Sequence, residues 1–393
     1  MSNRGSKFKY INEGNVHIVL QILNTNKVIR LVKEDNQKIQ LSTITNSIQY
    51  VNKIMVPLIF GDDHYHQEVT VLSENEIFEI SKDIEKWRPN HRKAKSKLSC
   101  YAITVPNLTI SSIKGENYCL EIKPKEGFID APLRKYSKCH YCLKQYLKLN
   151  NGEITSTSKY CPLDLFSGDY IRMKYALLNL LQNPQNNLKL FQNGSIVFSD
   201  KYKMQPDFIN DIFGSLNVFL NFIITILLCE KSNTRLIESD EVDDHKRGFN
   251  CNETNELDDT SFLYKLLSVQ KLANGLVLDL ENNNDHVTKV IGTLEEYKLD
   301  LSQQYDREKF VKVSNARDLA LISAVAKDCS IMLSFTLEHE SDLPHIVVNG
   351  RHVYYRLSVT DLEPKTIKTL RNRQNSEEKL SKTFEHYKNS IKS

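Results

Sequence analysis

The sequence predicts an α+β fold arranged as two domains or lobes, and three observations carry this prediction. The chain of 393 residues is longer than one average domain. Strand-like runs and helical spacing of apolar residues are mixed in the first hundred residues, whereas helical spacing dominates the rest. Apolar residues make up 40% of the chain and charged residues 26%, an ordinary globular composition that provides a sizeable core.

The first part of the chain is expected to contain four strands and one helix. The runs VHIVLQIL and KVIRLVK, at 16–23 and 27–33, are typical of strands, and the polar residues 24–26 between them predict a hairpin turn. Helical spacing follows over 39–54. Further strands are expected at 100–105, where Pro106 and Asn107 end the strand, and at 118–125.

The rest of the chain is expected to be mainly helical. Helical spacing predicts helices at 135–149, 170–181, 207–228, 261–278 and 319–326, with strands at 331–335 and 352–359. Residues 230–259 carry ten acids against four bases and almost no large apolar side chains, which predicts a solvated, disordered insertion. The charged tail is expected to end as a loose helix.

The composition excludes several classes of protein. Only 13 glycines and 10 prolines argue against collagen, a disordered low-complexity chain or a glycine-lined propeller. The net charge of +3 is too small for a protein that coats nucleic acid, and there is no basic stripe with interleaved aromatics. Eight cysteines, mostly single within apolar runs, are typical of reduced intracellular thiols rather than a disulfide scaffold.

Two features bear on localisation. The first residues, MSNRGSKFKY, are polar and basic and show no signal peptide, so a nuclear or cytoplasmic protein is expected. The apolar run at 216–229 is only 14 residues long, and Asn217, Asn221 and Thr225 recur in it at every fourth residue. This spacing gives one polar helix face, which predicts a buried core helix and no membrane span.

The segment EIKPKEG, at 121–127, is the most informative motif. Alternate residues of a strand share a face, so Glu121, Lys123 and Lys125 are expected to project one way while Leu120 and Ile122 face the core. A carboxylate with two lysines suits a site for a divalent cation and phosphate. A solvated strand edge would have the same spacing, and the motif alone does not decide between them.

Four other segments contain candidate residues that are indecisive alone. Gly14 begins one strand of the hairpin and Arg30 lies on the next, although no G-x-G-x-x-G or Walker sequence is present. PQNNLKLFQNG, at 184–194, has paired amides that usually mark a turn. Asp328 between a helix and a strand could be a cap, a metal ligand or a general base. Asp361, with Lys365 four residues later, is compatible with magnesium and phosphate.

Taken together, these segments resemble the inositol-pentakisphosphate 2-kinase family. EIKPKEG, SKYCPLDLFSG, PQNNLKLFQNG, AKDCSIML and DLEPK occur in the order and at roughly the spacing typical of that family. EGNVHIVL followed by VIRLVK resembles its nucleotide-binding hairpin, and WRPNHR its arginine segment. The resemblance covers nearly the whole chain apart from the acidic insertion and the tail.

The resemblance implies a two-lobed protein-kinase-like fold, with a mixed α/β N-lobe and a larger, mainly helical C-lobe that has inositide-binding insertions. The implied divisions are the N-lobe with its hinge at 1–107, a first C-lobe part at 108–229, the acidic insertion at 230–259, the remaining C-lobe at 260–369, and the tail at 370–393. We expect a monomer.

The resemblance also implies an activity, the ATP- and magnesium-dependent phosphorylation of the axial 2-hydroxyl of inositol 1,3,4,5,6-pentakisphosphate to give inositol hexakisphosphate. Such a substrate carries roughly −8 to −10 charges, so several Lys and Arg side chains must gather locally. The alternative is an inositol-phosphate-binding scaffold without catalysis. Retention of a base and a metal ligand argues against it.

Residue by residue, the resemblance assigns Asp328 as the base and Lys123 as a bridge between nucleotide and substrate. The expected nucleotide contacts are Gly14, Asn15, Arg30, Asn107, Glu121 and Asp361, of which Asp361 and Glu121 would bind magnesium. The expected inositide contacts are Arg92, Lys123, Lys125, Lys148, Asn186, Asn187, Lys189 and Lys365. Lys189 stands where some members have arginine, which keeps the charge but loses a bidentate fork.

Cys139 and Cys142 form a C-x-x-C pair, and Cys161 follows. This pattern permits a structural zinc site whose fourth ligand the sequence does not identify. The alternative is that these cysteines are packing residues of an amphipathic helix.

Overall fold

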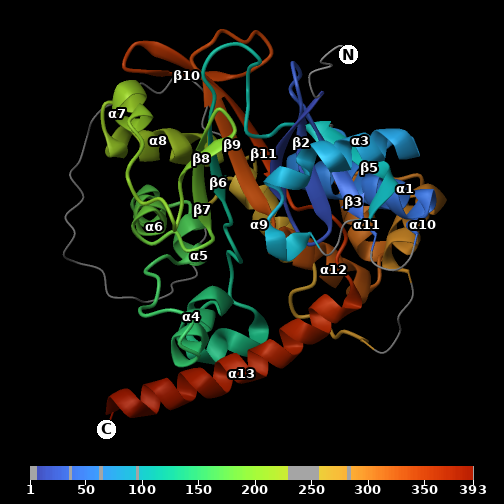
Figure 1. The fold of residues 1–393 in the computed structure, drawn as a ribbon. Helices are drawn as coiled ribbons and strands as arrows, with labels where there is room; N and C mark the ends of the chain where they lie inside the picture. The colour runs from blue at the N-terminus through green and yellow to red at the C-terminus, as the bar shows by residue number, and fades with distance from the viewer. Residues whose placement is uncertain are drawn as a thin grey trace, which may run out of the picture.

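The computed structural model describes residues 7–34, 38–61, 65–93, 97–228, 256–280 and 285–392. These residues form an α+β fold with two antiparallel sheets, so the predicted fold class is confirmed at this level (Figure 1). The acidic insertion predicted at 230–259 lies outside the described residues except for 256–259.

The five-stranded sheet contains the predicted hairpin. Its strand order is β1-β2-β3-β5-β4, and its strands are β1 (Phe8–Glu13), β2 (His17–Ile22), β3 (Lys27–Lys33), β4 (Glu68–Val71) and β5 (Leu98–Pro106). The turn between β2 and β3 places Asn24 at φ 61°, in the left-handed region that asparagine tolerates better than most residues. The hairpin prediction is confirmed, whereas β1 and β4 were not predicted.

Helices cover both faces of this sheet. On β3, Ile29 and Leu31 pack against α3 (Glu74–Ile84), whereas Val28 and Val32 pack against α1 (Leu41–Tyr50). Alternation along the strand is the physical reason, since successive side chains point to opposite faces. The helix predicted at 39–54 is confirmed as α1 followed by a π-helical turn (Val51–Met55) and α2 (Val56–Phe60).

The six-stranded sheet lies at the centre of the second, mainly helical part. Its order is β10-β11-β9-β6-β7-β8, and its strands are β6 (Tyr118–Ile122), β7 (Leu188–Gln192), β8 (Ser195–Phe198), β9 (Ser330–Thr336), β10 (His345–Val348) and β11 (Arg351–Thr360). The strand predicted at 118–125 ends earlier, at Ile122. The segment PQNNLKLFQNG contains the expected turn, and β7 follows it directly.

The helices of this part are α4 (His140–Asn150), α5 (Pro162–Leu165), α6 (Tyr170–Gln182), α7 (Phe208–Phe213), α8 (Leu216–Leu227), α9 (Phe262–Gln270), α10 (His286–Tyr297), α11 (Gln304–Val313) and α12 (Ala316–Ala326). The single helix predicted at 207–228 is divided at Gly214, whose φ is 75°. As predicted, α8 is a core helix, and Asn221 and Thr225 are buried with it. None of the described helices is long and apolar enough to cross a membrane.

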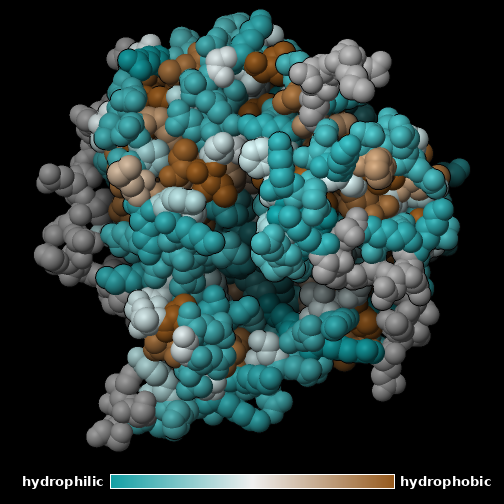
Figure 2. Space-filling view, in the orientation of Figure 1, coloured by the Kyte–Doolittle hydropathy of each residue, from teal (hydrophilic) through white to brown (hydrophobic). Residues whose placement is uncertain are grey.

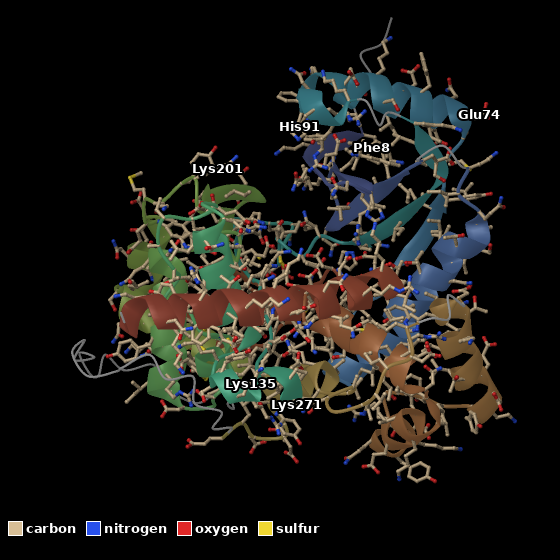
Figure 3. The ribbon with its side chains drawn as sticks, turned by 90° about the horizontal axis from the view of Figure 1, so that it is seen from below. Phe8, Glu74, His91, Lys135, Lys201 and Lys271 are labelled. Atoms are coloured by element: carbon tan, nitrogen blue, oxygen red, sulfur yellow. The ribbon has the colours of Figure 1, made fainter. Side chains whose placement is uncertain are left out.

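The tail forms α13 (Ile367–Lys392), a helix of 26 residues rather than the loose helix expected. It runs across the molecule beneath the other elements and lies along α4, as Figures 1 and 3 show. Leu380 and Phe384 are buried, and Tyr146 of α4 packs on Phe384 with ring centroids 5.0 Å apart. Leu380 and Phe384 therefore belong to the main core, whereas Leu370 packs in a smaller cluster with Ala320 and Leu321.

Candidate active site

The candidate site lies at one edge of the six-stranded sheet. β6 and β11 both run antiparallel to β9, so the carboxyl ends of β6 and β11 meet the amino end of β9. Ile122 pairs with Ile331, and Thr360 pairs with Ser330. The chain segments that follow β6 and β11 therefore meet the segment that precedes β9.

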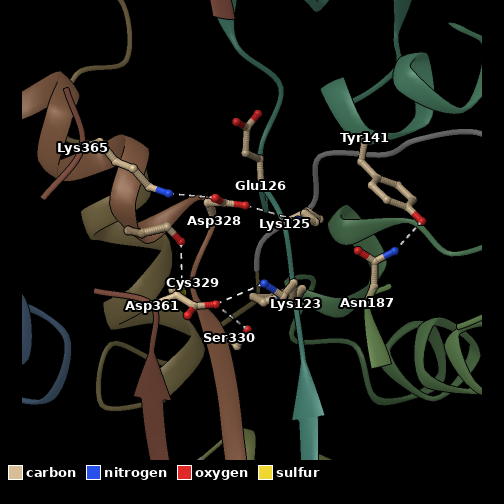
Figure 4. A network of polar contacts seen from close by, with 12 residues as sticks. Lys123, Lys125, Glu126, Tyr141, Asn187, Asp328, Cys329, Ser330, Asp361 and Lys365 are labelled. Carbon is tan, nitrogen blue, oxygen red and sulfur yellow. Dashed lines mark hydrogen bonds and ion pairs between the residues drawn. The ribbon is translucent and has the colours of Figure 1, made fainter. Parts of the chain in front are cut away.

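Asp328, just before β9, lies between two ammonium groups. Its carboxylate oxygens are 2.9 Å from Nζ of Lys365 and 3.5 Å from Nζ of Lys125 (Figure 4). Burial opposes ionisation of this carboxyl, but the Lys365 hydrogen bond and the Lys125 charge outweigh burial and hold its pKa below the ordinary value. Burial in turn lowers the pKa of Lys125. Asp328 is therefore a carboxylate at neutral pH.

A second carboxylate, Asp361, follows β11. Its Oδ2 lies 3.1 Å from Nζ of Lys123 and 3.3 Å from Oγ of Ser330, which is itself 3.2 Å from Oε1 of Glu121. The other oxygen of Glu121 accepts a hydrogen bond from Lys189 at 2.8 Å. Burial disfavours the charged form of Lys123, but Asp361 outweighs burial and raises its pKa. The cluster thus places carboxylates and ammonium groups side by side.

The loop that carries Lys125 is closely packed. Lys125 itself has φ 61°, a left-handed conformation that non-glycine residues rarely adopt. The hydroxyl of Tyr160 donates to the carbonyl of Pro124 at 2.7 Å. A Cβ atom on Gly127 would lie 2.4 Å from the ring of Phe166, so only glycine fits there. The segments EIKPKEG and YCPLDLFSG are therefore in direct contact.

The turn between β1 and β2 contains Gly14 and Asn15. Arg92 donates a hydrogen bond to Oδ1 of Asn15 at 2.7 Å. The preceding residue, Glu13, is buried and accepts hydrogen bonds from Arg88 at 2.8 and 2.9 Å. The structure thus brings three of the predicted residues together at the five-stranded sheet, and Arg92 lies beside the predicted nucleotide turn rather than in the Asp328 cluster.

Arg30 links the five-stranded sheet to the segment after β11. Its guanidinium forms an ion pair with Glu363 and lies 3.3 Å from Nδ1 of His17. Burial, followed by the charge of Arg30, lowers the pKa of His17 to about 4. His17 is therefore neutral at neutral pH. Glu363 stands two positions after Asp361 in the sequence, so its ion pair brings Arg30 close to the segment that contains Asp361.

Asn107 lies where the chain passes from β5 towards the six-stranded sheet. Its backbone N–H donates to the carbonyl of Asn26 at 2.6 Å, and its buried side chain accepts hydrogen bonds from Thr109.

In Figure 2, the face of the molecule is hollowed between the parts that carry the two sheets in Figure 1, and the walls of this hollow are hydrophilic.

Three predicted inositide residues remain, and of these Asn187 meets the Asp361 cluster through its backbone. Asn187 is buried, and its side-chain amide donates to the hydroxyl of Tyr141 at 3.2 Å. Its backbone carbonyl accepts a hydrogen bond from the backbone N–H of Lys123 at 2.8 Å. Asn186 is exposed in the same turn. Lys148 lies in the last turn of α4, and no contact among the described residues joins it to the Asp328 cluster.

The three predicted cysteines come together at the start of α4. Cys139 caps the helix, Cys142 lies in its first turn, and Cys161 precedes α5. Their sulfur atoms all lie within 4.8 Å of one another, and Cys139 and Cys161 are buried. Thiolates at such separations could share one soft metal ion.

Comparison with known proteins decides the family. The sequence pattern of the family described as inositol-pentakisphosphate 2-kinase matches residues 10–379. The chain belongs to this inositol-pentakisphosphate 2-kinase family.

Several relatives carry the same description. A protein named inositol-pentakisphosphate 2-kinase from Danio rerio is 31% identical, over 91% of this chain and 89% of that protein. A protein of the same name from Arabidopsis thaliana is 27% identical, over 89% of this chain and 81% of that protein. One from Oryza sativa subsp. indica is also 27% identical, over 78% and 71%. This member of the family is accordingly a kinase of inositol phosphates.

Sequence reasoning missed several residues that hold the site of this inositol-pentakisphosphate 2-kinase family member. Glu363 stands inside the quoted DLEPK segment, but nothing in its spacing indicated a pairing with Arg30. Ser330 stands inside the quoted AKDCSIML segment, but its spacing did not indicate that its hydroxyl would bridge Glu121 and Asp361. Gln270, which donates to the Lys125 carbonyl, and Arg373, which pairs with Glu126, carry no sequence signal, because they act on segments far from them along the chain.

Proposed function

We propose that this kinase transfers the γ-phosphoryl group of ATP to the axial 2-hydroxyl of inositol 1,3,4,5,6-pentakisphosphate, giving inositol hexakisphosphate and ADP. The observation that supports this most is Asp328, a carboxylate with Lys125 and Lys365 on either side. A substrate hydroxyl flanked by phosphates needs an anionic group that accepts its proton and cations that bind the flanking phosphates.

In this proposal, Asp328 orients the hydroxyl and accepts its proton late in the transfer. Phosphoryl transfer depends mainly on positioning and charge stabilisation, so a weakly basic carboxylate is sufficient. Lys125 and Lys365 would then exchange their contacts with Asp328 for contacts with phosphates. Because burial lowers the pKa of Lys125, an incoming phosphate would stabilise its charged form.

We further propose that Asp361 and Glu121 hold magnesium. Their carboxylate oxygens, with the hydroxyl of Ser330 between them, are hard donors of the kind that magnesium prefers. When bound, the ion would neutralise charge on the transferring phosphoryl group. Lys123 would reach the same group from the side of β6.

The nucleotide is assigned to the five-stranded sheet, with the two sheets acting as the lobes of a protein-kinase-like arrangement. In support, Arg30 projects towards Glu363 and the Asp361 segment, and Asn107 lies on the connection between the sheets. Nucleotide phosphates would replace Glu363 as the partner of Arg30. Gly14 and Asn15 would cover these phosphates.

A structural zinc ion is proposed for the three cysteines. Cys139 and Cys161 are buried together although 22 positions separate them, and zinc thiolate bonds would tie α4 to α5.

The deciding experiment is incubation of the purified chain with inositol pentakisphosphate, ATP and magnesium, followed by chromatography of the inositol phosphates. Inositol hexakisphosphate should form with one ADP for each product molecule. Asp328→Asn should lose the product, whereas the control Asp342→Asn, at an exposed carboxylate, should keep it. Pentakisphosphate binding without turnover in the unmodified chain would instead support the scaffold function.

A further inference from the structure

Gln270, the last residue of α9, is completely buried, and its side-chain amide forms hydrogen bonds with segments of the candidate site. Its Oε1 accepts the backbone N–H of Gly127 at 2.9 Å. Its Nε2 donates to the carbonyl of Lys125 at 2.9 Å and to the carbonyl of Ala326 at 3.2 Å. One amide therefore joins the loop after β6 to the end of α12.

One segment carries Lys125, a predicted substrate contact, and the other leads to Asp328, the predicted base. Lys125 is held by Gln270 through its own carbonyl, and Ala326 stands two residues before Asp328. The Lys125 backbone has φ 61°, a conformation that persists in non-glycine residues only when the surrounding structure enforces it. The two segments are about 200 positions apart in the sequence, so their spacing depends on tertiary contacts.

Gln270 is itself held in place. Its backbone carbonyl accepts a hydrogen bond from Ser323 of α12 at 2.5 Å, and Ser323 is also buried. α9 and α12 pack against one another, so the glutamine projects from a rigid pair of helices. Its side-chain amide is satisfied at both donor positions, which leaves it one arrangement.

We propose that Gln270 is a positioning residue that sets the separation between Lys125 and Asp328, and through it the placement of the substrate hydroxyl against the base. This inference rests on the proposed function of those two residues. An apolar side chain at position 270 would leave the Gly127 N–H and the carbonyls of Lys125 and Ala326 without their partner, and both segments would shift to find others. A displacement of about 1 Å in such a site can reduce the rate on the order of 10²-fold.

The test compares Gln270→Met with Val269→Ala in the full chain. Met has nearly the same length and no hydrogen-bonding amide, whereas Val269 is the buried neighbour on α9 whose truncation loosens packing without touching these hydrogen bonds. With ATP and inositol pentakisphosphate, we expect kcat of Gln270→Met to fall about 10²-fold with the KM for ATP changed by less than about threefold. Val269→Ala should keep kcat within about threefold while lowering the melting temperature.

A kcat of Gln270→Met within about threefold of the unmodified chain, or a loss equal to that of Val269→Ala, would overturn the proposal. If Gln270→Met does not fold, hydrogen exchange of the unmodified chain decides. The Gly127 amide should then exchange slowly, and rapid exchange would overturn the proposal. An unmodified chain that does not phosphorylate pentakisphosphate would refute the proposed function. The exchange measurement needs no activity, so the two failures can be told apart.

Discussion

Arg373 of α13 provides the sharpest test of how the tail is joined to the site. Its guanidinium pairs with Glu126, Asp130 and Glu377, and Nη2 lies 2.8 Å from Oε2 of Glu126 while Nε lies 2.9 Å from Oε1 of Glu377. Asp130 also lies 3.5 Å from Nζ of Lys327. The neighbours of Lys125 and Asp328 in the sequence therefore both belong to this ion-pair network.

Arg373→Met would leave the buried carboxylate of Glu126 without its cation, while Asp130 would keep Lys327. Removing one partner of a buried ion pair costs about 3–5 kcal/mol. The Arg373 side chain is 24% exposed, so the lower end of that range, about 3 kcal/mol, is appropriate. With the usual unfolding entropy per residue, this corresponds to a decrease of about 4 °C in the melting temperature of a chain of 393 residues.

Differential scanning calorimetry of Arg373→Met, Arg373→Lys and the control Lys379→Met measures this effect. Lys379 is exposed on the same helix, so its variant should melt within about 1 °C of the unmodified chain. Arg373→Lys should lie between, because it keeps the charge and loses the planar fork. If Arg373→Met melts like Lys379→Met, the network does not stabilise the chain and this reasoning is refuted.

Three further predictions concern the site. Asp328→Asn should lower kcat about 10²–10⁴-fold with little change in either KM, and kcat within about threefold would move the base elsewhere. Lys125→Ala should raise the KM for the inositide at least tenfold while leaving that for ATP nearly unchanged, because it removes a charge-assisted phosphate contact; equal effects would contradict the assignment. His17 has a pKa of about 4 in the folded chain and 6.5 as a free side chain, so the unfolded state binds its proton first, and stability should fall as the pH decreases from about 6.5 to 4. His17→Asn should show a shallower dependence of melting temperature on pH over this interval, and an unchanged slope would exclude His17 as its source.

Local sequence patterns were sufficient for much of the fold. The hairpin at 16–33, the helix from 39 and the buried helix at 216 were predicted because each depends on turn residues or on periodic apolar spacing within one segment. The predicted ends of helices and strands were less accurate where tertiary contacts set them. β6 ends at Ile122 because the loop after it turns back to meet Tyr160 and Gln270.

Short segments of the sequence predicted which residue types the candidate site contains, since Glu121, Lys123, Lys125, Asp328 and Asp361 all stand in segments that each resemble the family. It also indicated three cysteines that the structure brings within 4.8 Å.

Which of these side chains meet depends on how distant segments pack together. Asp328 and Lys125 are 203 positions apart, and they become neighbours because β9 runs antiparallel between β6 and β11. The pairing of Glu363 with Arg30, the buried amide of Gln270 and the anchoring of the tail by Arg373 likewise join distant segments. Such contacts leave no periodic signal in one segment, because their energy comes from burial and pairing of groups that chain folding alone brings together.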